Sequence, residues 1–189
     1  MSVRGGITRF FRDGSAKESG TSSWGAYAIS DRWAVDTVEQ ARRLSLEGVD
    51  FFQVREKDLG REELELLVRR VVEVAGPMKV LVNGVERMGA DGVHLSRANA
   101  EAGMDGLVSV ACHSIEEVLQ AVALRRSMVL FSPVFGKGDA AGVGVQALRE
   151  AVVAAGEVPV FALGGVSAEN VAACIAAGAA GVAGIRMFL

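Results

Sequence analysis

Three residues that can bind an anion alternate along the short segment QVREKD, which begins at Gln53. If the segment ends a β-strand, its period of two places Gln53, Arg55 and Lys57 on one face. A guanidinium forms bidentate hydrogen bonds with phosphate, and an ammonium adds a compact charge, so this face suits a phosphate or diphosphate. The alternative is a solvated cluster in which both cations pair with Glu56 and Asp58.

Two further polar residues occur at the ends of apolar segments. Asn83 precedes Gly84, so its amide could contact a ligand or form an Asx turn with the glycine. His94 lies in the apolar segment DGVHL, where a lone histidine is either a hydrogen-bonded interior group or a substrate contact. We treat Asn83 and His94 as candidate substrate-binding residues and leave both structural alternatives open.

His113 is the candidate for acid–base chemistry. It follows an apolar run and precedes Ser114, which forms a capping-box pattern with Glu117 and so predicts a helix start. An imidazole at that place can accept a proton from one ligand atom and return it to another. The next apolar run ends at Ser132 and leads into a glycine-rich loop, in which Lys137 could close over a ligand. We include Ser132 and Lys137 among the candidate substrate contacts.

Glycine-rich turns near the C-terminus predict a phosphate site made of backbone. Gly164 and Gly165 stand between an apolar run and a predicted helix, and Gly184-Ile185 is followed by Arg186. Backbone N–H groups without side chains in the way can approach an anion closely. Taken singly, each turn could also be purely structural.

Short apolar runs alternate with amphipathic stretches along the chain. Eight runs predict strands, at residues 24–30, 50–54, 79–82, 91–95, 106–111, 127–132, 158–163 and 179–185. Five stretches with apolar residues three and four apart predict surface helices, at residues 35–47, 61–75, 114–125, 145–155 and 168–177. The connections at 85–88 and 97–103 allow only one or two turns each.

Strands that are apolar on both faces and alternate with amphipathic helices predict an α/β fold with a parallel sheet. Eight such units indicate a compact (β/α)8 TIM barrel over residues 24–189, and an open doubly wound sheet is the alternative. The chain ends directly after the eighth strand, so the last helix is short or missing, which leaves a wall available for a homodimer contact. In these barrels chemistry takes place at the carboxyl ends of the strands, where the candidate residues fall.

Composition excludes several classes of function. The 189 residues carry a formal net charge of −3, without the basic excess that nucleic acid or a membrane surface would attract. The uncharged stretch at residues 171–185 is shorter than the roughly 20 apolar residues of a membrane span. Residues 1–23 are rich in Gly, Ser and charge, which predicts a flexible segment without a signal peptide. Two cysteines without metal-type spacing predict reduced thiols and a cytoplasmic protein.

Seven segments in order resemble the thiamine phosphate synthase/TenI superfamily: QVREKD, VNG, GADGVHL, CHSIEE, FSPVF, ALGGV and GVAGI. The resemblance covers residues 27–185 and implies a compact (β/α)8 barrel that handles the phosphorylated thiazole half of thiamine. One branch, thiamine phosphate synthase, joins thiazole phosphate to a pyrimidine diphosphate with magnesium. The other branch, TenI, aromatises the thiazole carboxylate phosphate by moving a proton, without a metal.

The resemblance to the synthase is incomplete. The strand-two residues and Asn83 match its diphosphate contacts, but its two magnesium-binding aspartates correspond to Gly84 and Asn99 here. A Ser expected before the histidine segment is Ala111, the Thr-rich loop is replaced by residues 136–138, and the final Ser is Arg186. Since magnesium needs anionic oxygen ligands, these changes argue against diphosphate displacement unless another carboxylate approaches the mouth.

The resemblance to TenI tolerates these changes and assigns proton transfer to His113. It implies that backbone N–H groups seat the thiazole phosphate and that Arg55 or Lys57 faces the carboxylate. The phosphate-binding residues are then Gly164, Gly165, Gly184, Ile185 and Arg186.

Three hypotheses remain open after these observations. The first is a metal-independent thiazole tautomerase, an isomerase with no cofactor and a small phosphorylated thiazole as its substrate. The second is thiamine phosphate synthase, a transferase that uses magnesium. The third is a non-catalytic phosphate-binding or regulatory barrel, which the short last helix and the altered sixth loop favour.

Overall fold

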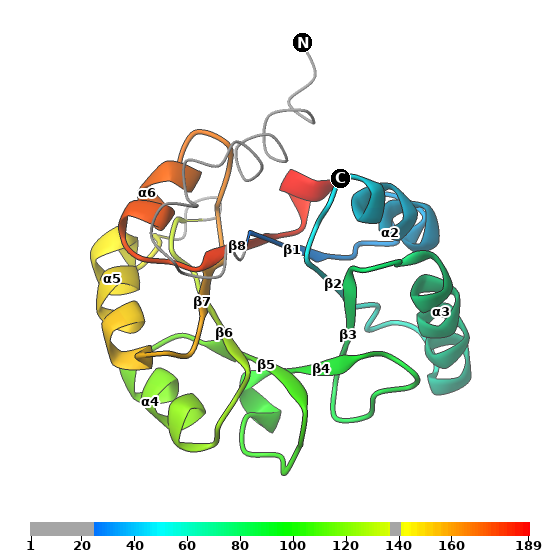
Figure 1. Cartoon of the computed structure of the whole chain (residues 1–189), viewed down its shortest axis with the longest axis horizontal. Helices are drawn as coiled ribbons and strands as arrows, with labels where there is room; N and C mark the ends of the chain where they lie inside the picture. The colour runs from blue at the N-terminus through cyan, green and yellow to red at the C-terminus, as the bar shows by residue number, and fades with distance from the viewer. Residues whose placement is uncertain (1–24, 137–140) are drawn as a thin grey trace.

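Eight parallel strands form a closed barrel in a computed structural model that describes residues 25–136 and 141–189 (Figure 1). The strands pair in sequence order, and β8 pairs with β1. Their bounds are β1 Ala26–Ile29, β2 Phe51–Val54, β3 Lys79–Asn83, β4 Gly92–Leu95, β5 Leu107–Cys112, β6 Met128–Phe131, β7 Val160–Ala162 and β8 Gly181–Gly184. This confirms the predicted TIM barrel and excludes the open sheet. The predicted segment 1–23 and Lys137 lie outside the described residues.

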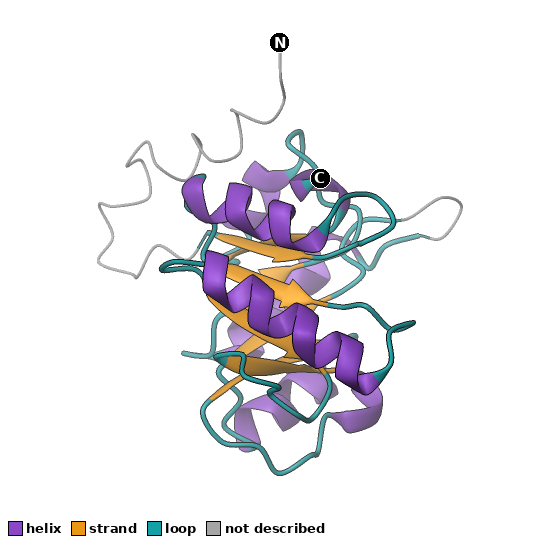
Figure 2. Cartoon of the chain, turned by 90° about the vertical axis from the view of Figure 1, so that its right-hand side faces the viewer, coloured by secondary structure: helices purple, strands orange, loops and turns teal. Residues whose placement is uncertain are grey.

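The described residues form five α-helices. Figure 2 shows helices on the outside of the strands. The five helices are α2 Thr37–Leu46, α3 Arg61–Val74, α4 Ile115–Ala123, α5 Gly144–Ala155 and α6 Val171–Ala176. Side-chain caps fix two of the starts, because Asp36 accepts the N–H groups of Val38 and Glu39, and Ser114 accepts that of Glu117. No helix in the described part of the chain is long and apolar enough to cross a membrane.

The predicted helix start after β7 is wrong by three residues. Ser167 does not cap a helix at residue 168. Its carbonyl instead accepts the N–H groups of Asn170 and Val171, and its own N–H donates to Asn170 Oδ1 at 2.9 Å. A turn therefore separates the glycine pair from α6, which begins at Val171.

Three of the eight strands are followed by little or no helix within the described residues. The β3–β4 connection has none, β4 leads into a single 3₁₀ turn, η2 Arg97–Asn99, and β8 leads into another, η3 Arg186–Phe188. These short connections explain how the barrel fits into so few residues, and they confirm the short last helix.

The last turn closes against the first helix of the barrel. Phe188 is buried, and its carbonyl accepts hydrogen bonds from Gln40 Nε2 at 3.3 Å and Arg43 Nη2 at 2.6 Å, both on α2. Figure 1 shows η3, in red, beside α2. A 3₁₀ turn thus covers part of the wall that a full helix would cover.

Inside the barrel, an apolar cluster fills the centre. Tyr27, Phe51 and Phe161 form its aromatic part, with each pair of ring centroids 5.8 Å apart. Two residues further along β2 and β3, the inward positions become polar, with Gln53 after Phe51 and Asn83 after Leu81. The interior is therefore apolar at its centre and polar toward the carboxyl ends of the strands.

Candidate functional site

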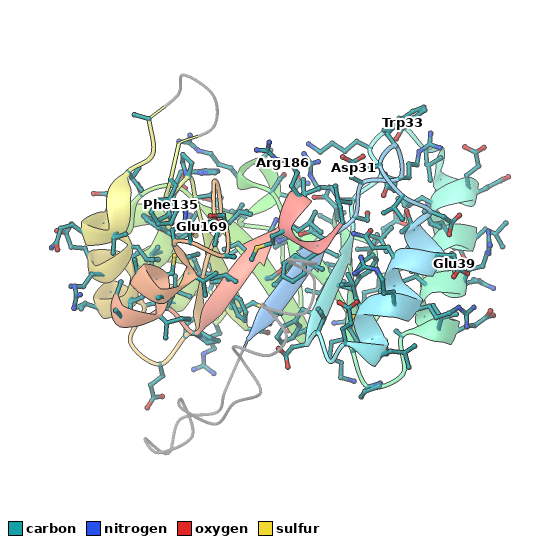
Figure 3. The ribbon with its side chains drawn as sticks, turned by 90° about the horizontal axis from the view of Figure 1, so that it is seen from above. Asp31, Trp33, Glu39, Phe135, Glu169 and Arg186 are labelled. Carbon is teal, nitrogen blue, oxygen red and sulfur yellow. The ribbon has the colours of Figure 1, made fainter. Side chains whose placement is uncertain are left out.

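The carboxyl ends of the strands gather the candidate residues at one mouth of the barrel. In Figure 3, Arg186, which follows β8, lies near Asp31, which follows β1, and these two strands are paired. The candidates come from β2, β3 and β4 on one side and from β5 to β8 on the other.

The cations of the QVREKD segment are free of ion pairs. Arg55 is half-buried and Lys57 is exposed, and neither has a carboxylate within 4.0 Å in the described ranges. Asp58 pairs instead with Arg32. The alternative of a self-neutralising cluster is therefore not present among the described residues, whereas β2 ends at Val54, so the shared face of Gln53, Arg55 and Lys57 stays a prediction. Both cations remain available for an anion.

Glu56, the other carboxylate of this segment, forms hydrogen bonds within the wall of the barrel. It is buried, and it accepts hydrogen bonds from the hydroxyls of Ser30 and Thr37 and from the backbone N–H of Arg32 at 3.3 Å. Ser30 Oγ also accepts the N–H of Arg55 at 2.9 Å. Glu56 therefore fixes the first turn after β1 and, through Ser30, the end of β2.

A hydrogen-bonded chain of five side chains lies beneath this side of the mouth. His94 Nδ1 lies 2.9 Å from Ser109 Oγ, which lies 3.1 Å from the hydroxyl of Tyr27. That hydroxyl donates to Gln53 Oε1 at 3.3 Å, and Gln53 Nε2 donates to Asn83 Oδ1 at 3.3 Å. All but Asn83 are buried, so His94 lies below the surface of the mouth.

Burial decides the ionisation of this chain. It lowers the pKa of His94 to about 4, with a further contribution from the positive charge of Arg55, so the imidazole is neutral near pH 7. It also raises the pKa of Tyr27 well above its usual value, against a smaller opposing effect of the Ser109 hydrogen bond. The hydrogen-bonded row of five side chains is therefore uncharged, and its members interact through hydrogen bonds alone.

His113 has the geometry of an acid–base group. Its side chain is exposed, and Nδ1 lies 2.7 Å from the carbonyl oxygen of Ser132 and 3.3 Å from the hydroxyl of the same residue. Because a carbonyl can only accept, Nδ1 carries the proton and the neutral ring has its lone pair on Nε2. The backbone N–H of His113 donates to Glu117, which pairs with Arg97 at 2.9 Å.

The loops after β6 and β7 pack backbone against backbone. Gly164 and Gly165 have φ angles of +93° and +65°. A Cβ would lie 2.8 Å from Pro133 Cα in the first case and 2.6 Å from the Gly136 carbonyl in the second. The N–H groups of Gly164, Gly165 and Val166 have no acceptor in the part of the chain that the structure describes. The loop therefore requires glycine and leaves backbone donors for an anion.

The loop after β8 requires glycine less strictly than the loop after β7. A Cβ on Gly184 would lie 2.9 Å from the flexible side chain of Met187 and at an ordinary contact distance of 3.9 Å from Phe188. Ile185 packs against the interior cluster, and the exposed Arg186 has no ion pair with any described residue. Arg186 is thus a free cation next to the backbone donors of this loop.

The donor set does not fit a magnesium ion. Gly84 offers no side-chain ligand, and Asn99 is an exposed neutral amide on η2. Asp58 is held by Arg32 and Glu86 by Arg61, the latter at 2.6 Å, so neither carboxylate is free to replace the missing aspartates. Within the described ranges, no three His, Cys, Asp or Glu residues gather as a metal site.

The fold places this protein among the (β/α)8 barrels, with its polar residues at the face where such barrels carry out chemistry. Within that class, the chain belongs to the thiamine monophosphate synthase family, whose model matches residues 26–188.

Relatives and solved structures support this membership. A putative thiamine-phosphate synthase 2 of Aquifex aeolicus is 32% identical over 180 residues, which cover 86% of this chain and 96% of that one. A thiamine-phosphate synthase of Bacillus velezensis is 33% identical, with 81% and 77% covered. The thiamine phosphate pyrophosphorylase of Pyrococcus furiosus has a TM-score of 0.77 at 25% identity, with 87% and 86% covered.

Three residues of the candidate site were not predicted from the sequence. Tyr27 and Ser109 connect His94 to Gln53, and Asn170 braces the glycine pair by donating to the Gly165 carbonyl at 3.0 Å. A signal for the first two exists, because each is a hydroxyl in an apolar run, where it must find a partner. Asn170 carries no comparable signal, since Asn is common in turns.

Proposed function

We propose that this protein is a metal-independent thiazole tautomerase that acts on the dihydrothiazole carboxylate phosphate. The observation that carries the proposal is the placement of His113, whose Nδ1 contacts the Ser132 carbonyl and whose Nε2 has no hydrogen-bond partner among the described residues. The mouth around it supplies cations and backbone donors but lacks carboxylates at positions 84 and 99. Such a site can bind a substrate with two anionic groups and lacks the two carboxylates that the resemblance to the synthase assigns to magnesium.

In this proposal, the phosphate binds to the backbone N–H groups of Gly164, Gly165 and Ile185, with Arg186 adding charge. The substrate carboxylate faces Arg55 and Lys57. His113 Nε2 removes a proton from one atom of the dihydrothiazole and returns it to another, so no atom or electron is gained or lost. The partner is a small molecule, and we expect the protein to work in the cytoplasm.

Thiamine phosphate synthase is the second candidate. The relatives bear that name, and the chain retains Gln53, Arg55, Lys57 and Asn83, which the resemblance assigns to diphosphate binding. The unpaired state of Arg55 and Lys57 suits a diphosphate as well as a carboxylate. What opposes this candidate is the donor set for magnesium.

Two parallel assays of the purified full chain separate the candidates. One contains the dihydrothiazole carboxylate phosphate and EDTA, and the other contains pyrimidine diphosphate, thiazole phosphate and magnesium. We expect aromatisation in the first and no thiamine phosphate in the second. Thiamine phosphate formation would overturn the proposal in favour of the synthase, and phosphate binding without turnover in either assay would indicate a binding barrel.

A further inference from the structure

The chain of side chains beneath the mouth has a direction, and the direction decides what the mouth presents to a ligand. The five members, His94, Ser109, Tyr27, Gln53 and Asn83, are linked one after the other. Each hydroxyl has a single proton to donate, so the orientation of one member dictates the orientation of the next.

The donors can be followed from Tyr27 in both directions. Tyr27 donates its proton to Gln53 Oε1, so the bond between Ser109 and Tyr27 at 3.1 Å is donated by Ser109, whose other acceptor, the Val93 carbonyl, lies farther away at 3.5 Å. Ser109 then accepts from His94, which must carry its proton on Nδ1. On the other side, Gln53 Nε2 donates to Asn83 Oδ1, so Asn83 is left with N–H donors for the mouth.

The reversed chain would satisfy the same bonds with the opposite outcome. Both amides would be turned over, Ser109 would donate to His94 Nδ1, and the ring would carry its proton on Nε2. Asn83 would then present a carbonyl oxygen, which is a ligand for a hard cation. The tautomer of His94 therefore reports which atom Asn83 offers to a ligand.

The amide orientations of Gln53 and Asn83 set the first direction, and the surroundings of His94 agree with it. Nδ1 is occupied by Ser109, and Nε2 has no hydrogen-bond partner among the described residues. Arg55 places positive charge close enough to act on the ring. That charge disfavours a second proton on the ring, so the neutral ring has one proton, which lies on Nδ1 when Ser109 donates its own proton to Tyr27.

We propose that His94, Ser109 and Tyr27 are positioning residues that hold Asn83 with its amide donors toward the mouth. The β2–β3 side then selects an anionic oxygen and disfavours a divalent cation. The identity of that anion as the substrate carboxylate rests on the proposed function. The direction of these hydrogen bonds does not rest on the proposed function, because the direction can be measured without substrate.

The test is the tautomer of His94 in ¹⁵N-labelled full-length protein at pH 7, read from long-range ¹H–¹⁵N correlations. The sequence has only two histidines, so the H113Q variant assigns the signals. We expect a neutral ring with the proton on Nδ1. In Y27F, which keeps the stacked ring but removes the central hydroxyl, we expect a mixture of tautomers.

Serine variants provide the matched control. S109A breaks the chain and should also lose the preference for one tautomer. S45A removes one hydroxyl that donates to the Ala75 carbonyl far from the chain, and should leave the His94 signals unchanged. A wild-type ring with its proton on Nε2, or a Y27F spectrum like that of the wild type, would overturn the proposal.

Titration with simple ions tests the consequence at the mouth. Sodium pyrophosphate alone should shift the Asn83 side-chain NH₂ signal, and magnesium chloride alone should not. In Y27F we expect pyrophosphate to bind about fivefold more weakly, the effect of roughly one hydrogen bond. A shift of the Asn83 signal with magnesium alone would contradict the proposal. If the spectra are as expected but the protein shows no tautomerase turnover, only the proposed function is contradicted.

Discussion

His94 and His113 lie at the ends of neighbouring strands, and their surroundings separate what each can do. His94 is buried and bonded to a hydroxyl, and the pKa of its ring is lowered to about 4. His113 is exposed and anchored by a carbonyl, with one nitrogen free. A proton carrier has to meet both solvent and substrate, so His113 suits chemistry and His94 suits orientation.

Replacement of His113 by glutamine tests the role of the imidazole. We expect the rate of aromatisation to fall by about 10²–10⁴, the usual contribution of a positioned acid–base group. Binding of the phosphorylated substrate should be nearly unchanged, because the phosphate contacts lie on other loops. The measurements are kcat in a stopped assay and Kd by calorimetry. Turnover equal to that of the wild type would exclude His113 as the proton carrier.

The sequence predicted single positions better than it predicted partners. Alternation along QVREKD is a local property of an extended chain, and it agrees with the inward position of Gln53, but β2 ends at Val54, so the shared face of Arg55 and Lys57 stays a prediction. It gave no information on Glu56 and Asp58, whose partners lie in the loop after β1. The link between Tyr27 and Ser109 spans 82 positions and arises only when the barrel closes, so strand alternation alone could not reveal it.

At the scale of elements, the loops after β6 and β7 act as one unit. The N–H groups of Val134 and Phe135 donate to the carbonyls of Leu163 and Gly164, each at 2.9 Å. The two loops are therefore in register like a short extension of the barrel. Any side chain at Gly164 or Gly165 would have to separate them.

The G165A variant tests whether this contact shapes the phosphate site. Its Cβ would lie 2.6 Å from the Gly136 carbonyl, so the two loops must separate. We expect the affinity for the phosphorylated substrate to fall at least about tenfold, a loss of roughly 1.4 kcal/mol in binding free energy. The measurement is Kd by calorimetry.

G156A is the matched control for this variant. Gly156 has a similar φ of +59°, but a Cβ there would meet nothing within 4 Å. Both variants should lose about 1 kcal/mol of stability from the left-handed backbone, and only G165A should lose affinity. Equal affinities for the two variants would place the phosphate elsewhere.

The short last turn also gives a prediction for stability. Phe188 is buried although it lies next to the last residue, and its carbonyl is held by Gln40 and Arg43. We expect F188A to lower the free energy of unfolding by about 3 kcal/mol, as for other buried phenylalanines. L46A is the control, since Leu46 is 80% exposed and should change stability by less than about 0.5 kcal/mol. Urea denaturation measures both, and similar losses would mean that η3 is not part of the core.

Helix boundaries show where sequence patterns lose resolution. The structure confirms the predicted start at Ser114, whose hydroxyl accepts the N–H of Glu117, but the Glu117 carboxylate accepts the N–H of His113 and so does not complete the capping box. After β7, Ser167 and Asn170 are both good caps three residues apart. The side chain of Asn170 accepts the Ser167 N–H and makes a turn, which moved the helix start to Val171.

At the scale of the whole molecule, two features determine which residues reach the mouth: the closure of the barrel and the depth of each residue inside it. Eight alternating units were enough to predict closure, since each repeats the same local pattern. Depth was not predictable, because it depends on strand register and tilt. His94 was predicted as either a hydrogen-bonded interior group or a substrate contact, and it is buried and bonded to Ser109, as the first alternative requires. Its direct contact with substrate stays a prediction.

A neutral histidine inside the barrel predicts how the whole protein responds to acid. The pKa of His94 is about 4 when folded and 6.5 in its ordinary state, so between these values the unfolded chain binds more protons than the folded one. Above pH 6.5 the titration of His94 therefore does not change the free energy of unfolding. As the pH falls from 6.5 toward 4, the free energy of unfolding decreases by up to about 3 kcal/mol. Burial also raises the pKa of Asp50, which acts in the opposite direction, so the comparison must be made against a variant. We expect urea unfolding of the wild type to lose more stability between pH 7 and pH 4.5 than that of H94Q, in which this position cannot titrate. Parallel losses in the two proteins would mean that His94 is protonated in the folded barrel, and that the chain beneath the mouth carries a charge.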